Sequence, residues 1–190
     1  EIWAALKNKN VYGTSGPRIL LWFDLINSPE GPAPMGSEIT MSQNPRFIVR
    51  AAGSFKQKPG CSNESIDSLS AKRQDYLCAG ECYNPSNQRE VIEKIEVIKI
   101  TPQVYAGEAV SPLIQDPWKS IPCQGKGECI VEFEDQDFSR DSVYYVRAIQ
   151  SPTPAINGSP LFQRDNFELC KGSFRTVLKD RVIIYELTNE

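Results

Sequence analysis

"CIVEFEDQDFSRDSVYYVRAIQ", residues 129–150, holds two runs rich in β-branched and aromatic residues, separated by an acidic turn. Runs of this kind are typical of strands, because branched and aromatic side chains pack well on a pleated surface. The turn "QDFSRD" between them predicts an antiparallel hairpin with a longer loop. This stretch therefore favours a fold built mainly from antiparallel sheets.

Strand patterns recur on both sides of this stretch. Residues 19–25 carry large apolar residues on both faces, which predicts a buried strand, and residues 47–52 predict a second one. "VIEKIEVIKI", residues 91–100, predicts a third strand with two mixed faces, and "RVIIYEL", residues 181–187, a last one. Short strands separated by turns predict a mainly β, β-sandwich-like fold with antiparallel sheets over residues 17–190.

Two short segments have a helical pattern instead. Ile2, Trp3 and Leu6 fall on one face of a predicted N-terminal helix that ends in polar residues. Spaced apolar residues among charged and small ones predict a small helical insertion on the surface, at about residues 62–82.

A cluster of small residues, "GTSGP" at 13–17, raises the question of phosphate binding. A phosphate-binding loop of the G-x-x-x-x-G-K-[ST] type follows a strand and opens a helix. Here the predicted order is reversed, and Pro17-Arg18 stands where lysine and a hydroxyl residue are needed. The cluster therefore predicts a chain reversal, in which Thr14, Ser15 and Arg18 are the candidates to approach a neighbouring domain.

Six cysteines and no histidine indicate disulfides and an oxidising compartment. The candidates are Cys61, Cys78, Cys82, Cys123, Cys129 and Cys170. In "PCQGKGEC", Cys123 and Cys129 flank a short glycine-containing loop, and we expect a bridge there that contributes about 2 kcal/mol.

Cys78 and Cys82 would lie one helical turn apart, which is too far for a disulfide if the helix continues through both. We therefore expect them to pair elsewhere, with Cys61 or Cys170. The alternative is a zinc site, in which C-x3-C and C-x5-C supply four thiolates.

Composition excludes several classes of function. With 21 basic and 24 acidic residues, the chain lacks the basic stripe of nucleic-acid-binding proteins. Its longest apolar run, residues 19–26, is interrupted by Asp24 and is too short to span a membrane. Because the chain opens with Glu1-Ile2-Trp3 and no leader pattern, we expect any targeting segment to lie outside it.

The absence of histidine from the chain also excludes Ser-His-Asp and Cys-His catalysis and imidazole metal centres. We expect the acidic side chains at one strand end and its turn to be solvated: Glu132, Glu134, Asp135, Asp137 and Asp141. A calcium loop would match only its first two elements there. A sugar-binding platform is a further alternative, and its candidate rings are Trp3, Trp22, Trp118, Tyr144 and Tyr145.

Long stretches resemble a known family. They are "EIWAALKNKNVYGTSGPRILLWFDL", "MGSEITMSQNPRFIVRAAGSFKQKPGC", "LCAGECYNPSNQREVIEKIEVIKITPQ", "DPWKSIPC" and "YYVRAIQSPTPAINGSPL". On these residues the chain resembles the carboxy-terminal part of a large bacterial family of unknown function. Members of that family are similar to PHP-type (polymerase and histidinol phosphatase) phosphoesterases.

The resemblance implies an exported protein, periplasmic or extracellular, with a preceding metal-dependent PHP-like domain. Residues 1–16 would then be the end of that domain and its exit turn. None of the family's metal ligands falls on a residue of this chain, so we expect no catalytic, cofactor-binding or metal-binding residue here. Divalent metal is expected only in the preceding domain, which is the expected partner.

Overall fold

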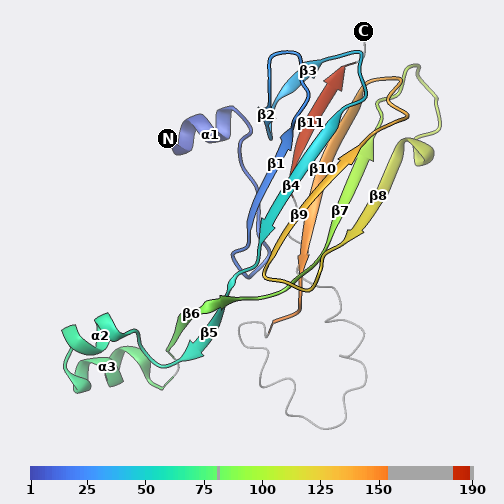
Figure 1. Ribbon diagram of the computed structural model, residues 1–190. Coiled ribbons are helices and arrows are strands. Elements are labelled where there is room, and N and C mark those ends of the chain that lie inside the picture. The colour runs from blue at the N-terminus through green and yellow to red at the C-terminus, as the bar shows by residue number, and fades with distance from the viewer. Residues whose placement is uncertain (81, 154–181, 189–190) are drawn as a thin grey trace.

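Two sheets pack face to face because their strands alternate apolar side chains toward a shared interior (Figure 1). The computed structural model describes residues 1–80 and 82–153 and the backbone of residues 182–188. The architecture confirms the mainly β prediction, with a short N-terminal helix and a small helical insertion. No helix in these residues is long and apolar enough to cross a membrane.

The first sheet has four antiparallel strands in the order β2-β1-β4-β9. Their bounds are β1 (Leu20–Leu25), β2 (Ala33–Pro34), β4 (Arg46–Ala52) and β9 (Glu128–Glu134). In β1, Phe23 is fully buried, whereas Trp22 on the other face is 46% exposed. The prediction that both faces of this strand are buried is therefore wrong, because no second layer covers the Trp22 side in the part of the chain that the structure describes.

The second sheet has five strands in the order β3-β11-β10-β7-β8. Their bounds are β3 (Glu38–Thr40), β7 (Ile92–Ile100), β8 (Ile114–Pro122), β10 (Ser142–Gln150) and β11 (Val182–Thr188), and a 3₁₀ turn, η1 (Ser111–Leu113), precedes β8. All neighbouring pairs are antiparallel except β3 and β11, which are parallel. In β7, Ile95 and Val97 lie in the shared core, and Ile98 on the opposite face is also buried.

The prediction of a hairpin over residues 129–150 is wrong. β9 pairs with β4 in the first sheet, whereas β10 pairs with β7 and β11 in the second. The connection carries Asp135, whose carboxylate accepts hydrogen bonds from Lys99 of β7 and Tyr144 of β10. These bonds hold the end of β9 against the second sheet, so the chain changes sheets at the acidic turn.

Aromatic rings join the two layers at the centre of the sandwich. Phe47 of β4 lies 4.9 Å from Tyr144 of β10, measured between ring centroids. Phe133 of β9 and Trp118 of β8 make an edge contact at 6.1 Å. Both sheets therefore contribute to one hydrophobic core, and its burial is the main stabilising term of the fold.

Two helical parts lie outside the sandwich (Figure 1). The predicted N-terminal helix is α1 (Ile2–Lys7). The predicted insertion contains α2 (Asn63–Ser68) and α3 (Ala71–Cys78), carried on a ribbon of β5 (Phe55–Pro59) and β6 (Tyr83–Arg89). Ser62 and Ser70 cap the two helices, and neither helix has a buried residue.

Candidate functional site

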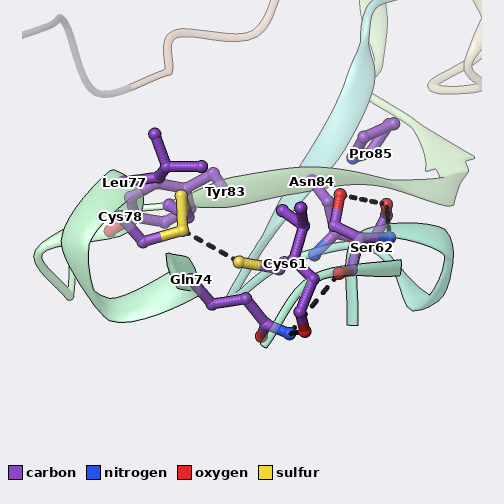
Figure 2. A pocket seen from close by; sticks show the side chains of 11 residues that line it. Cys61, Ser62, Gln74, Leu77, Cys78, Tyr83, Asn84 and Pro85 are labelled. Carbon is purple, nitrogen blue, oxygen red and sulfur yellow. Dashed lines mark hydrogen bonds between the residues drawn. A yellow bond between two sulfur atoms is a disulfide. The ribbon is translucent and has the colours of Figure 1, made fainter. Parts of the chain in front are cut away.

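Three cysteines gather in the insertion (Figure 2). Cys61 lies between β5 and α2, Cys78 ends α3, and Cys82 directly precedes β6. Cys78 and Cys82 form a disulfide, and the Cys61 sulfur lies 2.9 Å from the Cys78 sulfur. All three sulfurs lie within 4.8 Å of one another, and all three residues are half-buried.

The expectation that Cys78 and Cys82 pair elsewhere is therefore wrong. It assumed that the helix continues through both residues, but α3 ends at Cys78. Ala79 and Gly80 then adopt left-handed backbone conformations, with φ of 46° and 78°. These two residues turn the chain back and bring the two Cα atoms to 4.9 Å, within the range for a disulfide.

The cysteines line a pocket of about 370 Å³ between the helices and β6. Gln74 of α3 donates from Nε2 to the carbonyls of Leu69, at 2.8 Å, and Ile66, at 3.2 Å. On the other side, Asn84 donates to the carbonyl of Gly60 at 2.9 Å. Hydrogen bonds rather than apolar packing thus hold the segments that carry the cysteines.

The predicted pair Cys123–Cys129 is confirmed, with Cα atoms 5.7 Å apart. It joins the end of β8 to the start of β9 and so bridges the two sheets. The alternative of a four-cysteine zinc site is wrong, since one of its cysteine pairs lies in the sandwich, at β8 and β9, and the other in the insertion, at α3 and β6. Cys170 lies outside the described residues.

The segment between α1 and β1 follows the predicted order of helix, turn and strand. Gly16 adopts a φ of 133°, which suits the predicted chain reversal. Thr14 and Arg18 are exposed and Ser15 is half-buried. Their approach to a neighbouring domain stays a prediction.

One face of α1 is apolar and open to solvent: Ile2 is 80% exposed, Trp3 78% and Leu6 55%. The residues after the helix hold it on the sandwich, because Lys9 pairs with Glu38 and Asn10 donates to the carbonyl of Met35. A solvent-exposed apolar face on an anchored helix is typical of an interaction surface.

Asp135, which we expected to be solvated, is fully buried. Burial and the hydrogen bond to this carboxylate raise the pKa of Tyr144 well above its usual value. The sequence carried one sign of this arrangement, because Lys99 follows Ile95 and Val97 on the core-facing side of its strand. A lysine at such a position requires a buried partner.

A second ionic cluster lies on the opposite face of the five-stranded sheet. The Arg147 guanidinium lies 2.9 Å from the carboxylate of Glu96 and also binds Asp116 with both terminal nitrogens. Glu96 and Arg147 are both buried. The sequence pattern does not mark these residues as a buried cluster, because charged side chains that alternate along a strand are typical of its solvent-facing side.

The five aromatic residues considered for a sugar-binding platform do not form one surface. Tyr144 and Trp118 lie in or against the core with ring centroids 5.9 Å apart. Trp3 is on α1 and Trp22 on the outer face of β1, while Tyr145 is half-buried. The prediction that these five rings form a single sugar-binding platform is therefore wrong.

No family model, no curated protein and no solved structure matches this chain.

Proposed function

We propose that this chain is a non-catalytic β-sandwich domain of a larger, exported protein. It packs against a preceding PHP-like phosphoesterase domain and helps to shape that domain's substrate entrance. Residues 1–16 form the junction and residues 17–190 the accessory domain. The observation that carries this proposal is the solvent-exposed apolar face of α1.

The contacts of α1 support docking of another domain on this face. Its three large apolar side chains leave a hydrophobic surface that a partner would remove from water. Gly36 lets the backbone after the helix pass close, since a Cβ there would lie 2.5 Å from the carbonyl oxygen of Asn8. The helix is thus held in place while its apolar side stays free for a partner, and the family resemblance favours a PHP-like domain as that partner.

The chemistry of the chain supports a non-catalytic role. It has no histidine to bind metal or transfer protons. In the described residues, two carboxylates are buried, and both bind partners within the chain: Asp135 binds Lys99 and Tyr144, and Glu96 pairs with Arg147. The two disulfides fit a periplasmic or extracellular location.

Phosphoesterase assays and limited proteolysis test this proposal together. Chromogenic phosphate mono- and diesters with manganese, magnesium or zinc should be hydrolysed by the full-length protein and not by this chain alone. In the full-length protein, Trp3→Ser should speed cleavage at residues 8–18, because the helix loses its cover. Trp22→Ser, which changes an exposed tryptophan on the sandwich, is the matched control and should not. Hydrolysis by this chain alone, or equal cleavage of both variants and wild type, would overturn the proposal.

One observation favours a second function, an independent carbohydrate- or protein-binding module. On the outer face of the first sheet, Trp22, Arg50 and Ile130 are neighbours in register, and Trp22 and Ile130 are 46% and 65% exposed. An exposed aromatic residue with a basic residue opposite it in register suits a sugar ring or a partner side chain. Glycan-array binding that is lost in Trp22→Ser and kept in Trp3→Ser would establish this function instead.

A further inference from the structure

A free thiol and a disulfide lie in direct contact in the insertion. The Cys61 sulfur is 2.9 Å from the Cys78 sulfur, which is bonded to Cys82 (Figure 2). Disulfides exchange when a thiolate attacks one sulfur and displaces the other. Cys61 is therefore placed to attack Cys78, with Cys82 as the leaving group.

We propose that Cys61, Cys78 and Cys82 form a thiol–disulfide exchange site with two interchangeable pairings. The Cys61 thiolate forms a bond to the Cys78 sulfur, the Cys78–Cys82 bond breaks, and Cys82 leaves as a thiolate. The proton lost from Cys61 is balanced by the one that Cys82 then takes up. One disulfide and one thiol are present before and after, so no oxidant or reductant is needed.

The surroundings leave both pairings accessible. Neither helix of the insertion has a buried residue, so no packed core fixes one arrangement. Cys78–Cys82 closes a loop of sequence separation 4 and suits the turn at Ala79 and Gly80. Cys61–Cys78 closes a loop of separation 17 around both helices, which removes more entropy from the unfolded chain. Each pairing has one advantage over the other.

The exchange changes which segments are joined. In one pairing the bridge connects the end of α3 to the start of β6, and the free thiol is Cys61. In the other, the bridge connects α3 to the segment before α2, and the free thiol is Cys82. The site thereby moves the free thiol from the segment before α2 to the start of β6.

Tryptic peptide mapping distinguishes the two pairings. Trypsin cuts after Lys56, Lys72, Arg73 and Arg89 but not between Lys58 and Pro59, so Cys61 falls in peptide 57–72 and the other two cysteines in peptide 74–89. The native chain and Cys170→Ala are alkylated in denaturant at low pH, which stops exchange, and digested without reduction. We expect both forms in each sample: an internal disulfide in 74–89 with Cys61 alkylated, and 57–72 linked to 74–89 with Cys82 alkylated.

Three variants control the assignment. Cys82→Ser should give the linked peptides as its main product, because Cys61 and Cys78 remain in contact. Cys61→Ser should give only the internal disulfide. Cys61→Ser/Ser68→Cys keeps a thiol in the same peptide but on exposed Ser68 of α2, and should give linked peptides at no more than the background of Cys61→Ser.

Three results would overturn the proposal. The first is complete alkylation of Cys61 with no linked peptides in Cys170→Ala. The second is free Cys61 and Cys78 thiols in Cys82→Ser. The third is a Cys61–Cys170 bridge throughout the native chain, which would leave no thiol for exchange.

Discussion

At the level of single residues, Asp135 decides how the chain passes from one sheet to the other. Its carboxylate is fully buried and accepts hydrogen bonds from Lys99 and Tyr144. Removing one member of a buried ionic pair leaves the other charge uncompensated, at a cost of about 3–5 kcal/mol. We expect Asp135→Ala to lower the free energy of unfolding by this amount in urea denaturation. Asp137→Ala, two residues on and exposed, is the control and should change it by less than about 0.5 kcal/mol.

The raised pKa of Tyr144 leads to a prediction of how the stability of the fold changes at alkaline pH. The raised pKa of Tyr144 keeps its hydroxyl protonated in the folded state where the unfolded tyrosine, with a pKa of about 10, ionises. The folded state thus binds more protons above pH 10, and the free energy of unfolding falls as pH rises. We expect a smaller alkaline loss in Tyr144→Phe, measured by urea denaturation between pH 9 and 11. An identical loss in both proteins would contradict this assignment.

A substitution at Gly36 tests whether the close backbone approach at this residue holds α1 on the sandwich. Gly36 and Gly31 both have positive φ, at 89° and 102°, so alanine is strained at either position. Only at Gly36 would a Cβ also collide with the backbone of Asn8 and Lys9. We expect Gly36→Ala to increase proteolytic cleavage at residues 8–18 several-fold over Gly31→Ala. Equal cleavage would mean that this close approach does not hold the helix.

At the level of elements, the Cys123–Cys129 bridge joins strands of different sheets. Its loop has a sequence separation of 6, for which chain entropy gives a stabilisation of about 2 kcal/mol. We expect Cys123→Ala/Cys129→Ala to lower the free energy of unfolding of the sandwich by about 2 kcal/mol. Cys78→Ala/Cys82→Ala, in the insertion, should leave that free energy unchanged. The opposite order would mean that the insertion bridge supports the sandwich.

Sequence patterns predicted the elements better than their partners. β4 and β7 could be predicted from alternating residues, because successive side chains of a strand point to opposite faces and the local residue order therefore reflects which face is buried. The hairpin of β9 and β10 was wrong, because strand pairing depends on contacts such as Lys99 with Asp135 that are distant in sequence. The expectation that Cys78 and Cys82 pair elsewhere was wrong for a similar reason, since the left-handed turn at Ala79 brings them together without changing their spacing in the sequence. The Cys123–Cys129 pair was predicted correctly, because its short glycine-containing loop favours a local bridge.

At the level of the whole molecule, the insertion is a separate module on a two-stranded ribbon (Figure 1). Pro59 and Tyr83 are the last pair of that ribbon, so an Asn-Gly turn can replace residues 60–82. We expect this deletion to change the free energy of unfolding of the sandwich by less than about 0.5 kcal/mol, because neither helix has a buried residue. A larger loss in urea denaturation would show that the insertion contributes to the core's stability.

The parallel pairing of β3 with β11 has a consequence for the order of events in biosynthesis. Glu38 lies opposite Glu186, so β3 leaves the ribosome long before the strand that completes its sheet. Until residues 182–188 have been translated, β10 lacks one of its two neighbours, and β3 lacks the one strand with which it pairs among the described residues. Contacts between such distant parts of a chain form slowly, because a large loop must close first. The five-stranded sheet is therefore completed only after residues 182–188 have been translated, and until then the nascent chain carries open strand edges that chaperones would have to shield.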